Sequence, residues 1–327
     1  MDVVSFARAI REFGPIQRKK ILPKVITTLA GARVARDHVF ADFGEDAAAI
    51  DVGSQKLGLI AADGIMSQFA EQNPRGAGYA AILVCVDDIY VCGGTPLAAS
   101  IVISARNETQ LNEILAGINE GSEKFQVPVV RGHTHPDAPV AELSSSIFGT
   151  VSRKFFVSSR NARPGNVLLV ILDPEGRRSP YNPLIWDTTT MKPSEKILSM
   201  RRAYQQLAEH NLLLSAKDIS NAGIFGTLLQ MLEASGCGAK IDLQQIVVPP
   251  MMQTAKVTVL EMSEMFLASS FLVCTPPDAL PAIEKILAPV NYKVLNIGKT
   301  IPEKQIILTD GSTKEILFDY SSERLTI

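Results

Sequence analysis

The stretch 76-GAGYAAILVCVDDIYVCGGTPLA-98 carries the most information about the fold. Residues 76–92 are apolar on nearly every face, which is typical of a helix that is buried all round. The only charges in this helix are adjacent, Asp87 and Asp88. Gly93-Gly94-Thr95-Pro96 ends the helix, and residues 97–104 (LAASIVIS) have the composition of a strand. A buried helix next to a strand predicts a core that mixes α and β structure.

Further strands and a second helix complete this half of the chain. Residues 57–62 (LGLIAA) form a short apolar run that ends at Asp63-Gly64, as a buried strand does. Strands are also expected at 127–130 and 140–152. Before these two strands, Asn107 caps an amphipathic helix. Its apolar stripe is Leu111, Ile114, Leu115, Ile118 and Phe125. This order of elements predicts an α+β arrangement.

The turn-rich segment 160–166 (RNARPGN) divides the chain. Because 327 residues exceed the usual size of one domain, we predict two domains, residues 1–158 and 159–327. The second begins with the apolar strand 167–172 and again mixes helices with strands, so it is also predicted to be α+β.

Composition excludes several classes of function. The net charge is −2 and there is no basic run, which gives no reason to expect nucleic acid as a partner. No stretch approaches the roughly 18 uninterrupted apolar residues of a membrane helix, and the amino terminus lacks the apolar core of a signal peptide. Four widely spaced cysteines without a C-x-x-C pair favour the reducing cytoplasm over a disulfide framework.

Three aspartates lie in apolar surroundings: Asp46 in GEDAAAI (44–50), Asp63 and Asp88. An unpaired buried carboxylate is costly, so it is normally paired, protonated or bound to a cation. No Lys or Arg is near any of the three in the sequence, so local ion pairs are not expected. Carboxylates that converge without basic partners form the oxygen-rich environment that Mg²⁺ prefers. The alternative is that each acid caps a helix or lines a turn separately.

A fourth acid, Asp218, opens the segment DISNAG (218–223) directly before a predicted helix. Asn221 or Ser220 is expected to be the N-cap of that helix. Ala222 and Gly223 would let another backbone or a phosphate approach the helix N-terminus. A simple capped helix and an anion site are both compatible with this pattern.

The segment 131-RGHTHPDAP-139 follows an apolar strand. H-x-H-x-D after a strand is how several metal-dependent hydrolases begin their zinc site, so a zinc hydrolase is one hypothesis. Such a site would normally need a further histidine after Asp137, where the chain has Ala138. The remaining histidines, His38 and His210, have no matching motif around them.

In this order and spacing, the segments resemble the aminoimidazole ribonucleotide (AIR) synthase superfamily. Its members include formylglycinamidine ribonucleotide synthetase, selenophosphate synthetase, thiamine-monophosphate kinase and a hydrogenase maturation factor. GEDAAAI resembles the family's G-D-D-A-A-V-I, LGLIAADG its strand ending in T-T-D, and DISNAG its D-I-S-[ND]-G-G. The opening stretch is similar to G-x-x-A-x-x-x-x-x-x-D-I-x-x-x-G-x-x-P-L, and residues 146–170 to the family's domain junction.

The resemblance implies a two-domain α+β fold of the AIR synthase kind. Its N-terminal α/β half would pair strands with a second subunit to form a β-barrel in a homodimer, and its C-terminal half would be α+β. ATP would lie in a cleft of the dimer, with its phosphates held through Mg²⁺ by Asp46, Asp63 and Asp88. Asp218 would lie on the C-terminal side of the same cleft.

The resemblance also gives the histidine segment a different role. Arg131-Gly132-His133-Thr134 stands where family members have G-G-[DEH]-T, so it would be a phosphate and metal loop. His133 would orient the γ-phosphate or act as an acid or base, unless it is a structural histidine. His133 and Asp218 are therefore the predicted catalytic residues. The predicted nucleotide-binding residues are Gly44, Asp46, Asp63, Gly132, Thr134 and Asn221.

The activity implied is transfer of the γ-phosphoryl of ATP to an oxygen of a small-molecule acceptor, in a kinase- or ligase-like enzyme that needs Mg²⁺. A non-catalytic nucleotide-binding or assembly protein on the same fold is the alternative. Near these motifs, Asp87 is interpreted as a helix-surface acid rather than an extra metal ligand. Lys19 and Lys20 are interpreted as a solvated helix face rather than a phosphate-binding arm.

The chain departs from each named activity of the superfamily. It has no cysteine near the amino terminus, as selenophosphate synthetases have, and no carboxy-terminal cysteine, as the hydrogenase factor has. FGPIQRKK replaces the glycine-rich segment of the purine enzymes, and DISNAG fits the thiamine-monophosphate kinases poorly. We therefore predict a separate branch of the superfamily. Acceptor selection is expected in the loop 173–190, where two arginines would suit an anionic acceptor: Arg177, Arg178, Tyr181 and Trp186. An exposed mobile loop is the alternative.

Overall fold

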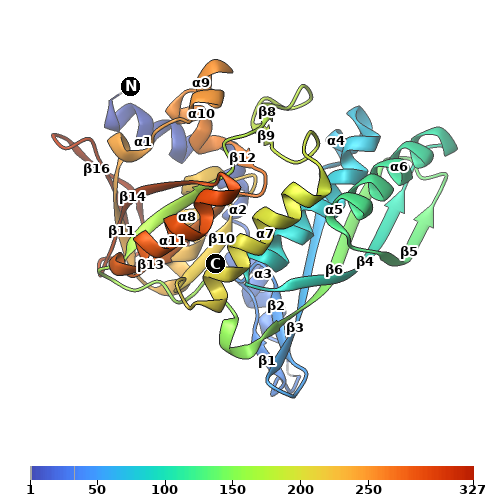
Figure 1. Ribbon diagram of the computed structural model, residues 1–327, viewed down its shortest axis with the longest axis horizontal. Coiled ribbons are helices and arrows are strands. Elements are labelled where there is room, and N and C mark those ends of the chain that lie inside the picture. The colour runs from blue at the N-terminus through green and yellow to red at the C-terminus, as the bar shows by residue number, and fades with distance from the viewer. Residues whose placement is uncertain (1, 33) are drawn as a thin grey trace.

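The computed structural model describes residues 2–32 and 34–327 (Figure 1). The first half contains α1 (Val3–Glu12), α2 (Gly14–Lys19), α3 (Leu22–Ala30), β1 (Val39–Ala41), β2 (Ala48–Asp51), β3 (Lys56–Ile65), α4 (Ser67–Gln72), α5 (Pro74–Val91), β4 (Thr95–Ser104), α6 (Glu108–Phe125), β5 (Val129–His135) and β6 (Glu142–Ser152).

The second half follows a short linker. It contains β7 (Val167–Leu172), β8 (Arg177–Arg178), β9 (Ile185–Asp187), α7 (Ser194–Glu209), β10 (Ser215–Asp218), α8 (Gly223–Ser235), β11 (Gly238–Asp242), α9 (Pro250–Thr254), α10 (Val259–Glu264), β12 (Phe266–Leu267), β13 (Phe271–Thr275), α11 (Leu280–Leu287), β14 (Lys293–Ile301), β15 (Gln305–Thr309) and β16 (Lys314–Asp319). The predicted α+β content is therefore confirmed in both halves.

The first sheet has the strand order β1-β2-β3-β6-β4-β5. Its neighbouring strands are antiparallel except β4 and β5, which are parallel because α6 connects them as a crossover. α5 lies against β3, β4 and β6, and α6 packs beside α5 (Figure 1). The opposite face of this sheet has no covering helix in the described chain, and large apolar side chains are exposed there: Ile60, Val102 and Phe148.

The second sheet has the order β10-β13-β7-β14-β11-β15-β16. Its central strand β7 is the apolar run VLLVIL, which is buried on both faces apart from Val167 at its start. The amino-terminal helix α1 packs on this sheet at β16, where Arg11 donates hydrogen bonds to Glu315 Oε1 at 3.1 Å and to the Ile316 carbonyl at 2.7 Å. The start of the chain thus contributes to the core of the second half. The predicted boundary at residues 158 and 159 stays a prediction.

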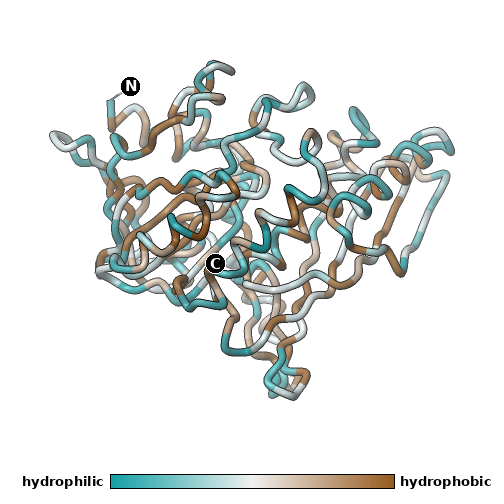
Figure 2. Tube along the Cα trace, viewed as in Figure 1, coloured by the Kyte–Doolittle hydropathy of each residue, from teal (hydrophilic) through white to brown (hydrophobic). Residues whose placement is uncertain are grey.

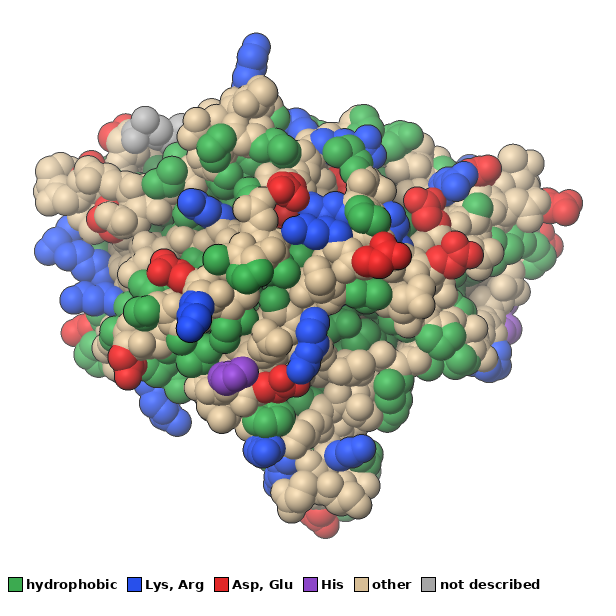
Figure 3. Space-filling model, viewed as in Figure 1, with side chains coloured by type: hydrophobic (Ala, Val, Ile, Leu, Met, Phe, Trp, Pro, Cys, Tyr) green, Lys and Arg blue, Asp and Glu red, His purple; other side chains and the backbone are tan. Residues whose placement is uncertain are grey.

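Apolar segments lie inside and polar ones at the turns. Figure 2 shows brown segments gathered in the interior and teal segments at the loops. Basic and acidic side chains are interspersed on the face drawn in Figure 3. Among the described residues, no helix has both the length and the hydrophobicity needed to cross a bilayer.

The opening stretch folds as its composition predicts, with one accessible stripe. α5 runs from Pro74 to Val91, and within residues 77–91 only Ala80, Val84 and Asp88 escape full burial. Gly93 ends the helix with a φ of +77°, a conformation that favours glycine. A Cβ on Gly94 would lie 2.4 Å from Leu59 Cδ1, so this turn needs both glycines to bring α5 onto the sheet.

The interpretation of Asp87 as a helix-surface acid is wrong. Asp87 is 3% exposed and forms an ion pair with Arg201 of α7, which is fully buried. The Ser269 backbone N–H donates to Asp87 Oδ2 at 3.1 Å, and Arg201 donates to Ser269 Oγ at 3.1 Å. Burial raises the pKa of Asp87, while the charge of Arg201 opposes that shift. The ion pair and its hydrogen bonds join α5 of the first half to α7 and to the turn before β13 of the second.

Replacing Arg201 with methionine should destabilise the protein by roughly 3–5 kcal/mol, because it leaves the Asp87 carboxylate buried and unpaired. The measurement is the free energy of unfolding in urea. The neighbouring Arg202, whose side chain is 54% exposed and paired with Glu209, provides the matched control. Arg202→Met should cost under about 1 kcal/mol. Equal losses from the two substitutions would contradict a special role for the buried pair.

Candidate functional site

Four aspartates from both halves of the chain meet in one cavity of about 450 Å³. Asp46 lies in the loop before β2, Asp63 in β3, Asp88 on α5 and Asp218 at the end of β10. One carboxylate oxygen each of Asp46, Asp88 and Asp218 lie within 4.8 Å of one another. The hypothesis that these acids converge fits this geometry, and the alternative of separate caps and turns does not.

Local structure explains how each acid reaches the cavity. Asp88 belongs to the one stripe of α5 that is not fully buried within residues 77–91. Asp46 follows Gly44, whose φ of +97° turns the loop, and a Cβ on Gly44 would lie 3.1 Å from an Arg160 nitrogen. The Asp218 backbone N–H donates to Asp46 Oδ2 at 3.3 Å, which ties the two halves of the site together.

Two lysines share the cavity with the acids, so the expectation that the acids lack basic partners is wrong. Lys217, with its side chain 8% exposed, is ion-paired with Asp46. Lys19 also lines the cavity, so its interpretation as a solvated helix residue is wrong as well, whereas Lys20 is exposed as expected. Lys217 is 171 positions from Asp46 in the sequence, so no local pattern could reveal the pair.

The crowding of the carboxylates shifts their protonation. Burial raises the pKa of Asp88 well above its ordinary range, and the negative charges of Asp218, Asp46 and Asp63 add to that rise. Burial and the charge of Asp46 raise the pKa of Asp218 to about 8. Burial also raises the pKa of Asp63. Four carboxylates thus face two ammonium groups, and the remaining carboxylate oxygens fit the ligand preference of a divalent cation such as Mg²⁺.

The predicted loop residues Gly132, His133 and Thr134 do not lie at the acid cavity. They belong to β5 itself and not to a loop after a strand, because β5 extends from Val129 to His135. Across the sheet, Asp63 pairs with Ser145 of β6, which pairs with Ile101 of β4, which pairs with Gly132. Two strands therefore separate Gly132 from Asp63 within one chain. None of the three β5 residues lines the acid cavity, and their role stays a prediction.

His133 and His135 are exposed on β5, with their ring centroids 4.7 Å apart. Among residues 2–32 and 34–327, metal-ligand geometry occurs at Asp46, Asp88 and Asp218 and not at this histidine pair. The structure therefore gives the zinc-hydrolase hypothesis no support.

The segment before α8 differs from the expected capped helix. The N-cap is Ala222, which makes no side-chain hydrogen bond, so the prediction of Asn221 or Ser220 as N-cap is wrong. Gly223 has a φ of +64°, and a Cβ there would lie 2.1 Å from the Ser263 carbonyl oxygen. The close approach that the sequence indicated is made by the backbone at the C-terminal end of α10. Ser220 lines the acid cavity and the exposed Asn221 does not, so the nucleotide-binding role of Asn221 stays a prediction.

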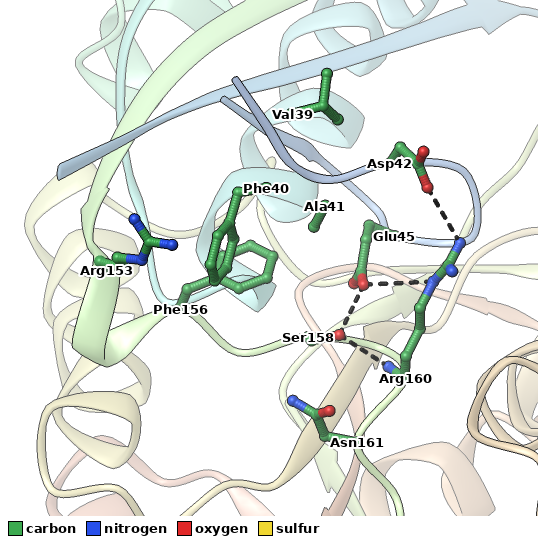
Figure 4. Close-up of a pocket in the computed structure, with 10 residues that line it drawn as sticks. All are labelled: Val39, Phe40, Ala41, Asp42, Glu45, Arg153, Phe156, Ser158, Arg160 and Asn161. Carbon is green, nitrogen blue, oxygen red and sulfur yellow. Dashed lines mark hydrogen bonds and ion pairs between the residues drawn. The ribbon is translucent and has the colours of Figure 1, made fainter. Parts of the chain in front are cut away.

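A second cavity of about 380 Å³ adjoins the acid cavity at Glu45, which lines both. Figure 4 shows Phe40 and Phe156 side by side on one wall, in an edge-on arrangement with ring centroids 5.7 Å apart. Glu45 accepts hydrogen bonds from Ser158 Oγ at 2.7 Å and from the Ser159 backbone N–H at 2.6 Å. Sequence reasoning missed this aromatic cavity, although Glu45 stands next to Asp46 in the GED motif.

The predicted acceptor loop is held in place. Lys192 is buried at its base and donates to both carboxylate oxygens of Asp173 and to the Thr188 carbonyl. Trp186 is fully buried in the core, so its predicted contact with an acceptor is wrong. Arg177 and Tyr181 line a third cavity, whereas Arg178 pairs with Glu261 at 3.3 Å. Pro180, Tyr181 and Pro183 at the tip of the loop are exposed, so the alternative of an exposed loop stays open for this part.

Two family models match the chain in succession. "AIR synthase related protein, N-terminal domain" matches residues 44–151, and "AIR synthase related protein, C-terminal domain" matches residues 163–311. The chain belongs to the AIR synthase-related family. The resemblance inferred from the motifs is thereby confirmed.

Individual AIR synthase-related proteins resemble the chain to different degrees. Protein MJ0640 of Methanocaldococcus jannaschii is 33% identical over 99% of this chain and 98% of its own length. A selenide, water dikinase of Myxococcus xanthus is 26% identical over 53% of this chain and 51% of its own. The structure of Thermotoga maritima PurL complexed with ATP superposes with a TM-score of 0.71 at 15% identity, over 86% of this chain. The chain spans about half the length of that PurL (47%), and this likeness concerns the fold alone.

Replacing Lys217 with methionine should destabilise the protein by roughly 3 kcal/mol, because Asp46 then faces Asp88 and Asp218 without its cation. The loss should shrink when Asp46→Asn is present in the same chain, since the uncompensated charge is then gone. A double-mutant cycle of urea unfolding at low salt, without divalent cations, measures this coupling. Additive losses would show that the two side chains do not interact.

Proposed function

We propose that this protein is an ATP- and Mg²⁺-dependent enzyme that transfers the γ-phosphoryl group to an oxygen of a small-molecule acceptor. The observation that carries the proposal is the group of Asp46, Asp88 and Asp218 oxygens within 4.8 Å of one another, in a cavity that also contains Asp63. Oxygen-only donor sets of this kind suit Mg²⁺ bound to substrate phosphates. The names of the relatives, a selenide, water dikinase and a PurL that was crystallised with ATP, agree with such chemistry.

Asp46, Asp63 and Asp88 would hold the metal. Mg²⁺ bound there would neutralise the charge that develops on the phosphates. Lys19 and Lys217 line the same cavity and would attract the phosphate oxygens by direct charge. In the transfer, an acceptor oxygen bonds to the γ-phosphorus as the bond between that phosphorus and the β–γ bridging oxygen breaks, and ADP leaves. Where the acceptor oxygen carries a proton, Asp218, which lines the same cavity, would receive it.

The base and ribose of ATP would occupy the adjoining aromatic cavity. Phe40 and Phe156 offer ring faces and edges for a purine, while Asp42 and Asn161 offer hydrogen-bonding groups (Figure 4). Glu45 stands between the two cavities, so a nucleotide that spans them would place its phosphates beside Asp46.

A second copy of the chain would complete the site. The uncovered face of the first sheet exposes Ile60, Val102 and Phe148 at 48%, 45% and 44%, which is unusual for side chains on one sheet face. Packing this face on its copy would form the intersubunit barrel that the family resemblance implies. β5 of one subunit could then bring Gly132, His133 and Thr134 to the acid cavity of the other subunit. Within one chain, two strands lie between these residues and the cavity.

The remaining expectations form part of the same proposal. All four cysteines are buried as free thiols, which supports a reducing cytoplasm. Small molecules rather than nucleic acids are the proposed substrates, since the net charge is −2 and charges of both signs are mixed on the face drawn in Figure 3.

Calorimetric titration of ATP with Mg²⁺ should show binding to the wild type and at least a roughly tenfold loss of affinity in Asp88→Asn, because a metal-binding carboxylate is lost. Asp278→Asn removes one negative charge from an exposed site outside these cavities and should bind as the wild type does. Absence of Mg²⁺-dependent binding to the wild type would sink the proposal. Binding without any ATP turnover would instead favour the non-catalytic alternative.

Mixing two inactive variants tests the shared site. Asp88→Asn and His133→Ala should each lack ATP turnover, and mixed dimers should regain it, because one of their two sites then carries both native residues. Turnover on mixing is the measurement. No recovery, despite exchange of subunits, would place both residues in the same subunit's site.

The dimer itself is tested by charge on the apolar face. Phe148→Lys should convert the dimer to monomers in light scattering after size-exclusion chromatography. Met191→Lys, which changes an exposed apolar residue (62% exposed) outside this face, is the control and should leave the dimer intact. A wild-type monomer at all concentrations would contradict the barrel.

A further inference from the structure

A third cavity, of about 290 Å³, lies between α4, α5 and the loop 177–190. Its walls are largely apolar, with Phe69, Tyr79, Leu83 and Phe266 among the side chains that line it. This volume is close to the lower end of pockets that hold small organic molecules. Neither the metal site nor the nucleotide site proposed above uses it.

The cavity is connected to the acid cluster through α5. Ala80 and Val84 line the cavity, and Asp88 lines the acid site. These three residues are spaced four apart, so they lie on one face of the helix on successive turns. They are also the only residues within 77–91 that are not fully buried. Val84 and Asp88 are four residues apart, so their Cα atoms are separated by about 6 Å along the helix axis.

Two side chains with hydroxyl groups, Tyr79 and Thr189, line the cavity. Tyr79 is 5% exposed and Thr189 is 1% exposed. Both hydroxyl oxygens are closed off from solvent, and the two hydroxyls interact with each other. A ligand in the cavity would therefore contact the carbon atoms of these side chains, which adds to the apolar character of the walls.

The charges around the cavity cancel. Arg177 pairs with Asp187 at 3.2 Å, and Arg75 pairs with Glu120 at 3.2 Å. Each arginine that could attract an anion is thus matched by a carboxylate. The sequence alone suggested an anionic acceptor from the arginines, because it did not reveal these acidic partners.

We propose that this cavity binds the non-reacting part of the phosphoryl acceptor, and that this part is an uncharged ring. The ring packs against Phe69, Leu83 and Phe266. The acceptor then extends along Val84 to present its oxygen at Asp88 and Asp218. The inference rests on the proposed function only where it identifies the ligand as the phosphoryl acceptor. The binding of a ring depends on the cavity alone.

Ligand-observed NMR with three probes of one shape and different charge tests the proposal: benzamide, benzoate and benzylammonium. Benzamide should bind at millimolar concentration, at least threefold more tightly than either ion. Ala80→Trp, which fills the cavity, should abolish its binding. Leu115→Trp, which enlarges an exposed apolar side chain outside the cavity, is the control and should leave benzamide binding unchanged.

Several outcomes would overturn the inference. Preference for benzoate would restore an anionic acceptor. Benzamide binding that survives Ala80→Trp, or that MgATP displaces, would place the ring in another site such as the Phe40–Phe156 cavity. No binding of any probe would remove the cavity as a ligand site. If benzamide binds as expected but MgATP does not, the proposed ATP-dependent function fails while the ring site stands.

Discussion

The ion pair between Asp87 and Arg201 fixes how the two halves of the chain meet. Both side chains are withdrawn from water, and the Ser269 backbone and hydroxyl complete their hydrogen bonds. A buried pair of this kind is costly to break because either partner alone would be an unsolvated charge. Its position on α5 means that the next residue, Asp88, is turned about 100° around the helix toward the cleft. The pair therefore orients the acid site as well as the domains.

The acid site depends on this meeting of the halves because each half alone supplies an incomplete set of charges. Asp46, Asp63 and Asp88 come from the first half, whereas Lys217 and Asp218 come from β10 of the second. Carboxylates this close repel one another, as the raised pKa values of Asp88 and Asp218 reflect. The packing of α5 and β10 holds them together, with Lys217 offsetting part of the repulsion. Such a strained, negatively charged cavity is suited to a metal cation, whose binding relieves the repulsion.

Three cavities line up around this cluster, and their chemistry differs in a way that suits three parts of a reaction. The cavity with Phe40 and Phe156 is aromatic and polar, the central cavity is acidic, and the cavity with Tyr79 and Thr189 is apolar with paired charges at its edge. Glu45 joins the first to the second, and the stripe Ala80, Val84 and Asp88 joins the second to the third. In the function that we propose, ATP and the acceptor would enter from opposite sides and meet at the acid cluster.

The sequence by itself determined α5 and the family. A long apolar run with two adjacent acids, ended by two glycines, is compatible with few structures other than a buried helix. Several motifs in a fixed order identify a family, which the chemistry of any single motif does not. Asp46, Asp63 and Asp88 were predictable as a group because a carboxylate in an apolar segment is costly unless it is paired, protonated or bound to a cation. Only the tertiary structure decided which acid is paired and which is free. Asp87 and Asp88 are neighbours in the sequence, yet the turn of the helix sends one to Arg201 and the other to the cavity. Lys217 meets Asp46 across 171 positions, and Arg177 meets Asp187 across the loop, because charge pairing is set by distance in space, which the order of residues does not specify.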